Sequence, residues 1–191
     1  MMWDFAEAQP FGDSVGDWLH AIDNVLIALD NASFNHNIGH TEISPATHHP
    51  LPDDSTHYFF TDPPYYDAIP YADLSDFFYV WLKRTLPPAP ARMFRDDHAP
   101  KDEECIVDEV KGKDKEYFER TMEQAMAEGR RILVPNGIGH VVFANKSTAG
   151  WEAQLQAMVS AGWFFTGSWP IDTEMGTRLR GMNSAALTSS V

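Results

Sequence analysis

Cysteine and basic residues are scarce in this 191-residue sequence, and long apolar runs are missing. The single cysteine, Cys105, excludes a disulfide framework and a zinc ribbon built within the chain. No apolar run approaches the roughly 18 residues of a membrane-spanning helix. The acidic first residues lack the basic segment of a signal peptide. These absences predict a cytoplasmic protein without a membrane partner.

The shortage of basic residues, 14 Lys and Arg against 28 Asp and Glu, leaves a formal net charge of −14. Such a surface repels nucleic-acid phosphates on average, which favours a small-molecule enzyme or an interaction module. The charge is uneven, because acids concentrate in residues 1–30 and between Asp96 and Glu128, whereas Lys146 lies in an acid-poorer stretch. The average therefore weakens a nucleic-acid interpretation without excluding it.

The sequence does contain an alternation of helical and strand patterns. Apolar spacing predicts helices at residues 17–32, 72–84, 114–128 and 148–162. Short apolar runs predict strands at 56–60, 140–144 and 163–171, a short one at 39–44, and the opening of another at 184–191. This alternation predicts an α/β fold with a mostly parallel sheet, whose sites lie beyond the carboxyl ends of the strands.

Some local features are also predicted. The strand at 56–60 is short and has apolar residues on both faces, so we expect it to be buried on both. Asp73 is the expected cap of the second helix, and residues 135–137 predict a turn. The last helix is expected to end at Gly162 and to bury Trp151, Leu155, Met158 and Val159. Residues 89–113, charged and proline-containing, predict a mobile loop or excursion.

An unusual tetrapeptide, Asp62-Pro63-Pro64-Tyr65, follows the strand at 56–60. Prolines cannot continue a strand ladder, and a carboxylate at a strand end is costly unless something uses it. Asp62 and the proline carbonyls offer acceptors to an exocyclic amine, and Tyr65 offers a ring on which a base can stack for roughly 1–3 kcal/mol. Accepting both N–H bonds localises the lone pair of the amine, which can then attack a methyl group. The pattern predicts a pocket for a flipped nucleobase; the alternative is a rigid turn followed by core aromatics.

The segment TDPPYYDAIPYADLSDFFYVWLKR resembles motif IV of amino-methylating DNA methyltransferases, and more narrowly the adenine-specific DNA methylases that also carry a zinc ribbon. WDFAEAQPF, GHVVFANKSTAGWEAQLQAMVSAGWFF and SWPIDTEMGTRLRGMNSAAL resemble the C-terminal half of that family, so the likeness covers most of the chain. The resemblance implies transfer of a methyl group from S-adenosylmethionine to the N6 amine of adenine in DNA. Asp62 and the Pro63 carbonyl would hold the amine, Pro64 would fix the turn, and Tyr65 would stack on the base.

The family's cofactor motif, a strand followed by Phe-x-Gly-x-Gly, has no counterpart in this sequence. The glycines of PFGDSVGDW have the wrong spacing, and Gly137 and Gly139 lead into a strand rather than out of one. We therefore expect residues 1–191 to be the C-terminal part of a single methyltransferase domain. Its fold would be a partial Rossmann-like one, with helices on both faces of the sheet and the first strands missing. Residues that bind S-adenosylmethionine would lie in an N-terminal half, supplied as a separate chain.

Further candidates for substrate contact are Tyr66 and Asp67 after the motif, Lys146 after the strand at 140–144, and Arg178 and Arg180 in a polar loop. For the arginines, phosphate contact and an ordinary solvated turn are both open. Acids beside Cys105 raise the pKa expected for its thiol, which disfavours a nucleophilic role. The spacing of five histidines matches no metal site: His36, His40, His48, His49 and His57.

Three interpretations of the chain stay open at this point. The first is the base-binding half of an adenine-specific DNA methyltransferase. The second is a non-catalytic remnant that binds nucleic acid or a partner chain. The third is methylation of RNA or of a protein amide, because Asn/Asp-Pro-Pro-Tyr motifs also serve those reactions.

Overall fold

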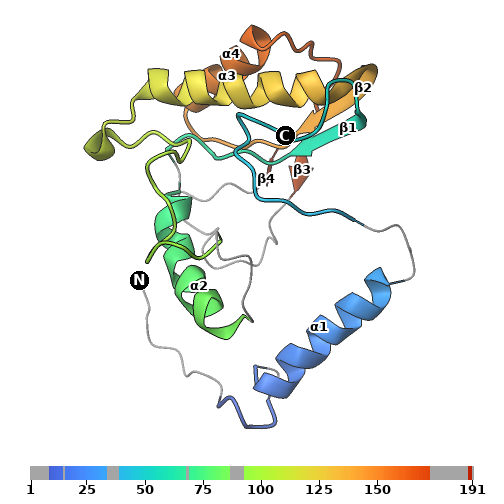
Figure 1. Cartoon of the computed structure of the whole chain (residues 1–191), viewed down its shortest axis with the longest axis vertical. Coiled ribbons are helices and arrows are strands. Elements are labelled where there is room, and N and C mark those ends of the chain that lie inside the picture. The colour runs from blue at the N-terminus through green and yellow to red at the C-terminus, as the bar shows by residue number, and fades with distance from the viewer. Residues whose placement is uncertain are drawn as a thin grey trace. The chain divides into compact units, whose positions relative to one another are not determined.

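A computed structural model describes residues 9–14, 16–33, 39–67, 69–86, 93–172 and 189–190 (Figure 1). The chain divides into two compact units, Met1–Glu42 and Ile43–Val191. The first unit contains helix α1 (Trp18–Ala32), which confirms the helix predicted at 17–32. Asp17 caps it by accepting a hydrogen bond from the His20 N–H at 2.8 Å. None of the described helices has the length and apolar character needed to cross a membrane.

The second unit is built on two parallel strands, β1 (Thr56–Thr61) and β2 (Leu133–Val141). Their register shifts between Thr56 and Tyr58, where β2 takes up extra residues. The Pro-Asn-Gly turn predicted at 135–137 is therefore an irregularity within β2, and this strand begins before the predicted residue 140. Two very short strands, β3 (Ile171–Asp172) and β4 (Ser189–Ser190), form a separate antiparallel pair.

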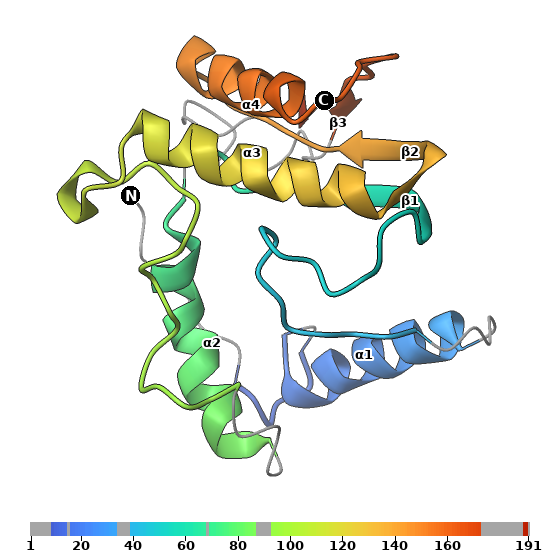
Figure 2. The same ribbon diagram turned by 45° about the horizontal axis from the view of Figure 1, so that its top comes forward.

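Helices α3 (Lys115–Ile132) and α4 (Thr148–Ser160) pack against each other, and α3 lies along the parallel strands (Figure 2). Asp114 caps α3 by accepting from the Tyr117 N–H at 2.8 Å, and Ser147 caps α4 by accepting from the Gly150 N–H at 3.1 Å. The core of the unit joins these helices to one tyrosine of the predicted motif: Tyr66, Phe118, Met122, Met126, Ala153, Ala157 and Met158. These elements confirm an α/β fold with a small parallel sheet.

The strand predicted to be buried on both faces is covered on one face only. Phe59 packs under α3 at Gly129, where an added Cβ would lie 2.6 Å from the Phe59 ring. Successive side chains of a strand point to opposite faces. The neighbouring Tyr58 and Phe60 are accordingly 52 % and 63 % exposed. Within the described part of the chain, the expected helices on the second face are not seen.

The helix predicted at 72–84 is α2 (Tyr71–Thr85), but its cap was predicted wrongly. Pro70 precedes the helix without a side-chain cap, and Asp73 lies in the first turn, where its carboxylate pairs with Lys111 at 2.8 Å. The apolar face of α2 is exposed: Leu74, Phe77, Phe78, Trp81 and Leu82. The helical spacing of apolar residues predicts that α2 has an apolar face, but it does not predict whether another element covers that face.

The face of α4 was also predicted wrongly in part. The buried face of α4 consists of Gly150, Ala153, Gln154, Ala157 and Met158, whereas Leu155 and Val159 are exposed. Small residues face α3 because they allow two helices to approach closely. Gly162 does end the helical segment, with a φ of +83°.

Of the strand predicted at 163–171 only the last residue is in a strand, and residues 39–44 form none. Of the strand predicted at 184–191, Ser189–Ser190 is β4 and the rest lies outside the described residues.

Residues 93–113 follow α2 and include the short helix η1 (Glu109–Lys111). Several hydrogen bonds tie this segment to α2 and to the motif: the Ala72 N–H donates to Glu104 at 2.8 Å, and the Val107 N–H to the Tyr66 carbonyl at 3.1 Å. The ammonium of Lys113 is buried and donates to two backbone carbonyls of the same segment. The mobility predicted for 89–113 stays a prediction, and residues 87–92 lie outside the described residues.

Candidate functional site

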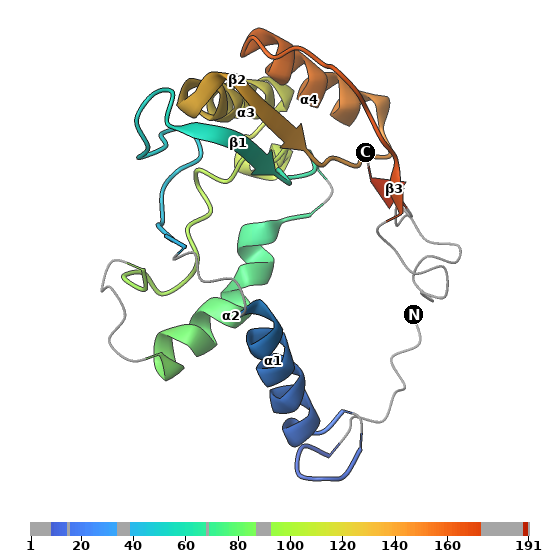
Figure 3. The same ribbon diagram turned by 90° about the vertical axis from the view of Figure 1, so that its right-hand side faces the viewer.

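The carboxyl ends of β1 and β2 lie side by side, as the arrowheads in Figure 3 show. Thr61 pairs with Val141, and the Val142 N–H continues the ladder by donating to the Thr61 carbonyl at 2.9 Å. The chain leaves β1 as Asp62 and leaves β2 as residues 142–147. In a parallel sheet this edge gathers the loops that follow each strand. The structure therefore brings the predicted tetrapeptide to the end of the second strand.

Two hydrogen-bond acceptors of the tetrapeptide are unused by the described residues. The Asp62 side chain is exposed, and its carboxylate makes no hydrogen bond or ion pair with them. The Pro63 carbonyl likewise accepts no hydrogen bond from them, although Pro63 itself is buried. Prolines have no N–H to donate and fix φ, so this stretch of backbone is rigid. A carboxylate and a carbonyl are thus held in a fixed extended segment at the strand end.

Tyr65 follows these acceptors in the chain, and its side chain is half-buried. It packs edge-on against Phe143, with ring centroids 5.4 Å apart and planes at 71°. Phe143 packs in turn edge-on against Trp151, at 5.0 Å. The Tyr65 ring is thus connected to the aromatic residues that follow β2 and begin α4.

Tyr66 has a different environment from Tyr65. Its φ is +56°, in the left-handed region that a non-glycine residue enters at a cost of about 1–3 kcal/mol. Its side chain is 8 % exposed and packs edge-on against Phe118 of α3 at 5.2 Å. The backbone turn between the two tyrosines sends one ring to the site and the other into the core. A substrate contact for Tyr66 stays a prediction, and the ring is placed as a core residue.

Asn145, at the end of β2, was missed by the sequence reasoning. Its side-chain amide donates to the Tyr65 carbonyl at 3.3 Å, and its Oδ1 accepts from the Ser147 N–H at 2.8 Å and from the Ser147 hydroxyl at 2.9 Å. The Asn145 side chain is buried. Tyr65 and Asn145 are 80 positions apart in the chain, so no local sequence pattern predicts their contact.

Tyr71, the first residue of α2, was also missed. Burial raises the pKa of Tyr71 above its ordinary value, a hydrogen bond with the Tyr65 backbone opposes that rise, and the charges of Asp62 and Glu104 add to it. Its hydroxyl is therefore protonated at neutral pH.

The other predicted site residues are placed as follows. Asp67 and Lys146 are exposed, the latter directly after Asn145 at the same sheet edge. Arg178 and Arg180 lie outside the described residues. The pKa of the Cys105 thiol is raised to about 12, chiefly by burial, with a smaller contribution from Glu104. A thiol with this pKa carries almost no thiolate at neutral pH.

The described residues do not fit S-adenosylmethionine. The turn after β1 is made of prolines, and no glycine lies between Val142 and Ser147 after β2. Gly137 and Gly139 lie within β2, and the Trp163 indole covers Gly139 so closely that a Cβ there would come within 2.2 Å of it. In the part of the chain that the structure describes, no group of three or more His, Cys, Asp or Glu side chains is arranged to hold a metal ion.

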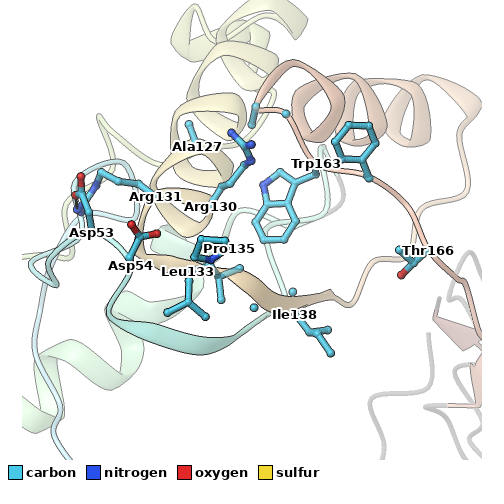
Figure 4. Close-up of a pocket in the computed structure, with 16 residues that line it drawn as sticks. Asp53, Asp54, Ala127, Arg130, Arg131, Leu133, Pro135, Ile138, Trp163 and Thr166 are labelled. Carbon is cyan, nitrogen blue, oxygen red and sulfur yellow. Dashed lines mark hydrogen bonds and ion pairs between the residues drawn. The ribbon is translucent and has the colours of Figure 1, made fainter.

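An open groove of about 760 Å³ lies at the other end of β2 and is lined by none of the predicted site residues (Figure 4). Arg131 turns there toward Asp53 and also pairs with Glu128 at 2.9 Å. Arg130 faces Trp163, whose indole N–H donates to the Met126 carbonyl at 2.9 Å. The groove runs along β2 from Leu133 to Gly139, and none of the residues of the tetrapeptide lines it.

Comparison of the chain with family models, with curated proteins and with solved structures finds no match in any of the three.

Proposed function

We propose that this chain provides the base-binding half of an amino-methyltransferase, with the N6 amine of adenine in DNA as the target. The observation that supports the proposal is the pair of unused acceptors, Asp62 and the Pro63 carbonyl, beside the Tyr65 ring at a carboxyl end of the parallel sheet. An amine has two N–H donors, and these two acceptors can take both. The resemblance of TDPPYY to motif IV points in the same direction.

In this proposal the adenine leaves the DNA stack and lies on the face of Tyr65. Stacking of a base on an aromatic ring is worth about 1–3 kcal/mol, which offsets part of the cost of unstacking it. Hydrogen bonds to Asp62 and to the Pro63 carbonyl then orient the amine and localise its lone pair. The rigid prolines keep the acceptors in place, so little reorganisation is needed when the nitrogen becomes positively charged.

The methyl donor implied by the resemblance is S-adenosylmethionine, which the described residues do not fit. The donor would be held by a separate chain that carries the strand and Phe-x-Gly-x-Gly motif. In this arrangement the fold would be a partial Rossmann-like one. Because an amine in RNA or in a protein amide presents the same two donors, those substrates are the alternatives.

The test is transfer of a labelled methyl group from S-adenosylmethionine to adenine-containing DNA, with this chain alone and mixed with a chain that carries the glycine motif. We expect transfer in the mixture, no transfer to DNA already methylated at N6, and at least a hundredfold loss with Asp62→Asn. Asp102→Asn, at an exposed carboxylate without a partner among the described side chains, is the matched control. Absence of transfer in the mixture would contradict the proposal.

A second candidate is a module that binds a partner chain without catalysis. The exposed apolar face of α2 favours it, with Phe77 and Phe78 67 % and 64 % exposed. Apolar patches of this kind mark association surfaces in soluble proteins. The mixing experiment separates the two candidates, since a complex that forms but transfers no methyl group supports only the second.

A further inference from the structure

Asn145 is the buried polar residue that joins the two strand ends of the candidate site. Its four polar contacts form one connected set: its amide donates to the Tyr65 carbonyl, its Oδ1 accepts twice from Ser147, and its backbone carbonyl accepts the Trp151 indole N–H at 2.8 Å. Trp151 also holds Phe143, the ring that Tyr65 packs against. The backbone and the ring of Tyr65 are thus both fixed by the segment that follows β2.

Packing leaves Asn145 little freedom to adopt another position. Gly150, in the first turn of α4, lies directly against it, and a Cβ added to Gly150 would come within 2.5 Å of the Asn145 Cγ. The glycine is needed there for this close approach, because its φ is not in the left-handed region. The Asn145 amide nitrogen donates to the segment after β1, and its oxygen accepts from the segment after β2. Because both groups are buried and hydrogen-bonded, Asn145 connects the two strand ends in one fixed orientation.

We infer that Asn145 is a positioning residue for base binding: it holds the Tyr65 backbone carbonyl and thereby fixes the point from which the Tyr65 ring projects. This role rests on the proposed function and adds a residue that the tetrapeptide motif does not contain. A donor is required at this point, because the partner is a carbonyl oxygen. Replacement of Asn145 by aspartate would place a carboxylate oxygen next to the Tyr65 carbonyl oxygen, and the two would repel each other. A protonated aspartic acid would instead donate a hydrogen bond to that carbonyl.

The experiment uses the full chain and DNA in which 2-aminopurine replaces the target adenine. The fluorescence of this base rises when it leaves the stack and changes again when it lies on an aromatic ring, and total DNA binding is measured separately by anisotropy. For Asn145→Asp at pH 8 we expect the base-binding signal to fall about tenfold at unchanged anisotropy. At pH 5, where burial favours protonation of the introduced carboxyl, the signal should recover relative to the unmodified chain.

Two variants make the result specific. Asn136→Asp introduces the same charge at an exposed position in the irregular part of β2, and it should change neither the signal nor its pH dependence. Gly150→Ala displaces the Asn145 side chain without altering its chemistry, and it should lower the signal at both pH values. A merely structural role would lower thermal stability in Asn145→Asp without a recovery at pH 5 that parallels carboxyl protonation.

The outcomes separate the role of Asn145 from the function on which it rests. If the unmodified chain gives no 2-aminopurine response, the proposed base binding is wrong and the role of Asn145 falls with it. If the unmodified chain responds and Asn145→Asp responds equally at pH 8, the base binding stands and the role of Asn145 is overturned.

Discussion

At the scale of single residues, the adjacent Tyr65 and Tyr66 have different environments because the backbone turns between them. Tyr66→Ala would empty a buried site against Phe118, so we expect the free energy of unfolding to fall by about 3 kcal/mol. Tyr65→Ala would remove a ring that is only half-buried, including its edge contact with Phe143, so we expect a smaller cost of about 1 kcal/mol together with loss of 2-aminopurine stacking. Guanidinium unfolding of both variants tests this, and equal costs would contradict the placement of the two rings.

Another residue-scale feature is Glu128, whose pKa is lowered to about 2 by hydrogen bonds from the Arg131 side chain first and then from the His49 N–H. An acid with a lowered pKa stabilises the fold above its ordinary value, 4.5, and this contribution is lost as pH falls from there toward 2. Glu128→Gln should therefore cost about 1 kcal/mol at pH 7. Urea unfolding across pH 7 to 2.5 should show the difference between the two proteins shrinking below pH 4.5, and a constant difference would contradict the assignment.

The residues that define the site were predictable to different extents. The tetrapeptide is local, so Asp62 and Tyr65 could be identified from spacing and chemistry, and their position at a strand end could be inferred from the α/β alternation. Asn145 could not, because its significance comes from a contact with Tyr65, 80 positions away in the chain. Tyr71 is close to the motif in sequence, but the sequence does not show that its hydroxyl shares a hydrogen bond with the Tyr65 backbone. An asparagine after a strand resembles any loop asparagine until its partner is known.

At the scale of elements, helices were predictable because their apolar period and caps are local. The ranges predicted from residues 17 and 114 match α1 and α3, whose caps are Asp17 and Asp114, whereas the one cap that was predicted, Asp73, is not the cap of α2. The covered faces were not predictable, since Tyr58 and Phe60 have the composition of a buried strand and yet lie exposed. The buried face of α4 was predicted only in part: Met158 is buried as expected, but the small residues Gly150, Ala153 and Ala157 share that face, whereas the prediction followed the larger Leu155 and Val159.

The contact between α3 and β1 depends on a glycine, which leads to a prediction for Gly129→Ala. Alanine favours a helix by about 1 kcal/mol over glycine, but here its Cβ would lie 2.6 Å from the Phe59 ring. Phe59 is backed by Trp163 at 5.9 Å, and the Trp163 indole is held by its hydrogen bond to Met126. We therefore expect a net loss of about 1–2 kcal/mol of stability.

The control for this prediction is Gly39→Ala, where an added Cβ meets nothing within 4 Å and stability should be unchanged. Adding Phe59→Leu to Gly129→Ala should recover part of the loss, because the smaller side chain leaves room for the Cβ. Thermal unfolding of the variants measures the coupling. A stabilising Gly129→Ala would mean that the helix and the strand do not approach each other this closely.

At the scale of the whole molecule, a net charge of −14 and exposed apolar faces act in opposite directions on association. Like charges keep copies apart at low salt, whereas the apolar face of α2 favours contact. Salt shortens the screening length from about 10 Å at 0.1 M to about 3 Å at 1 M. We therefore predict that association of the isolated chain, measured by light scattering, increases with salt, and that Phe78→Gln with Trp81→Gln reduces it. A monomer at every salt concentration would contradict this prediction.

The same charge limits how DNA can be bound, and this determines the expected salt dependence. The affinity of a protein for duplex DNA falls with salt at a logarithmic slope of about −0.9 for each phosphate neutralised. Lys146 is the described cation next to Asn145 at the candidate site, so Lys146→Gln should make the slope shallower by about one such contact. Arg130→Gln removes an exposed cation at the opposite end of β2 and should leave the slope unchanged. Anisotropy titrations from low to moderate salt measure both slopes. If Arg130→Gln changes the slope and Lys146→Gln does not, DNA approaches the groove at the start of β2 rather than the tetrapeptide.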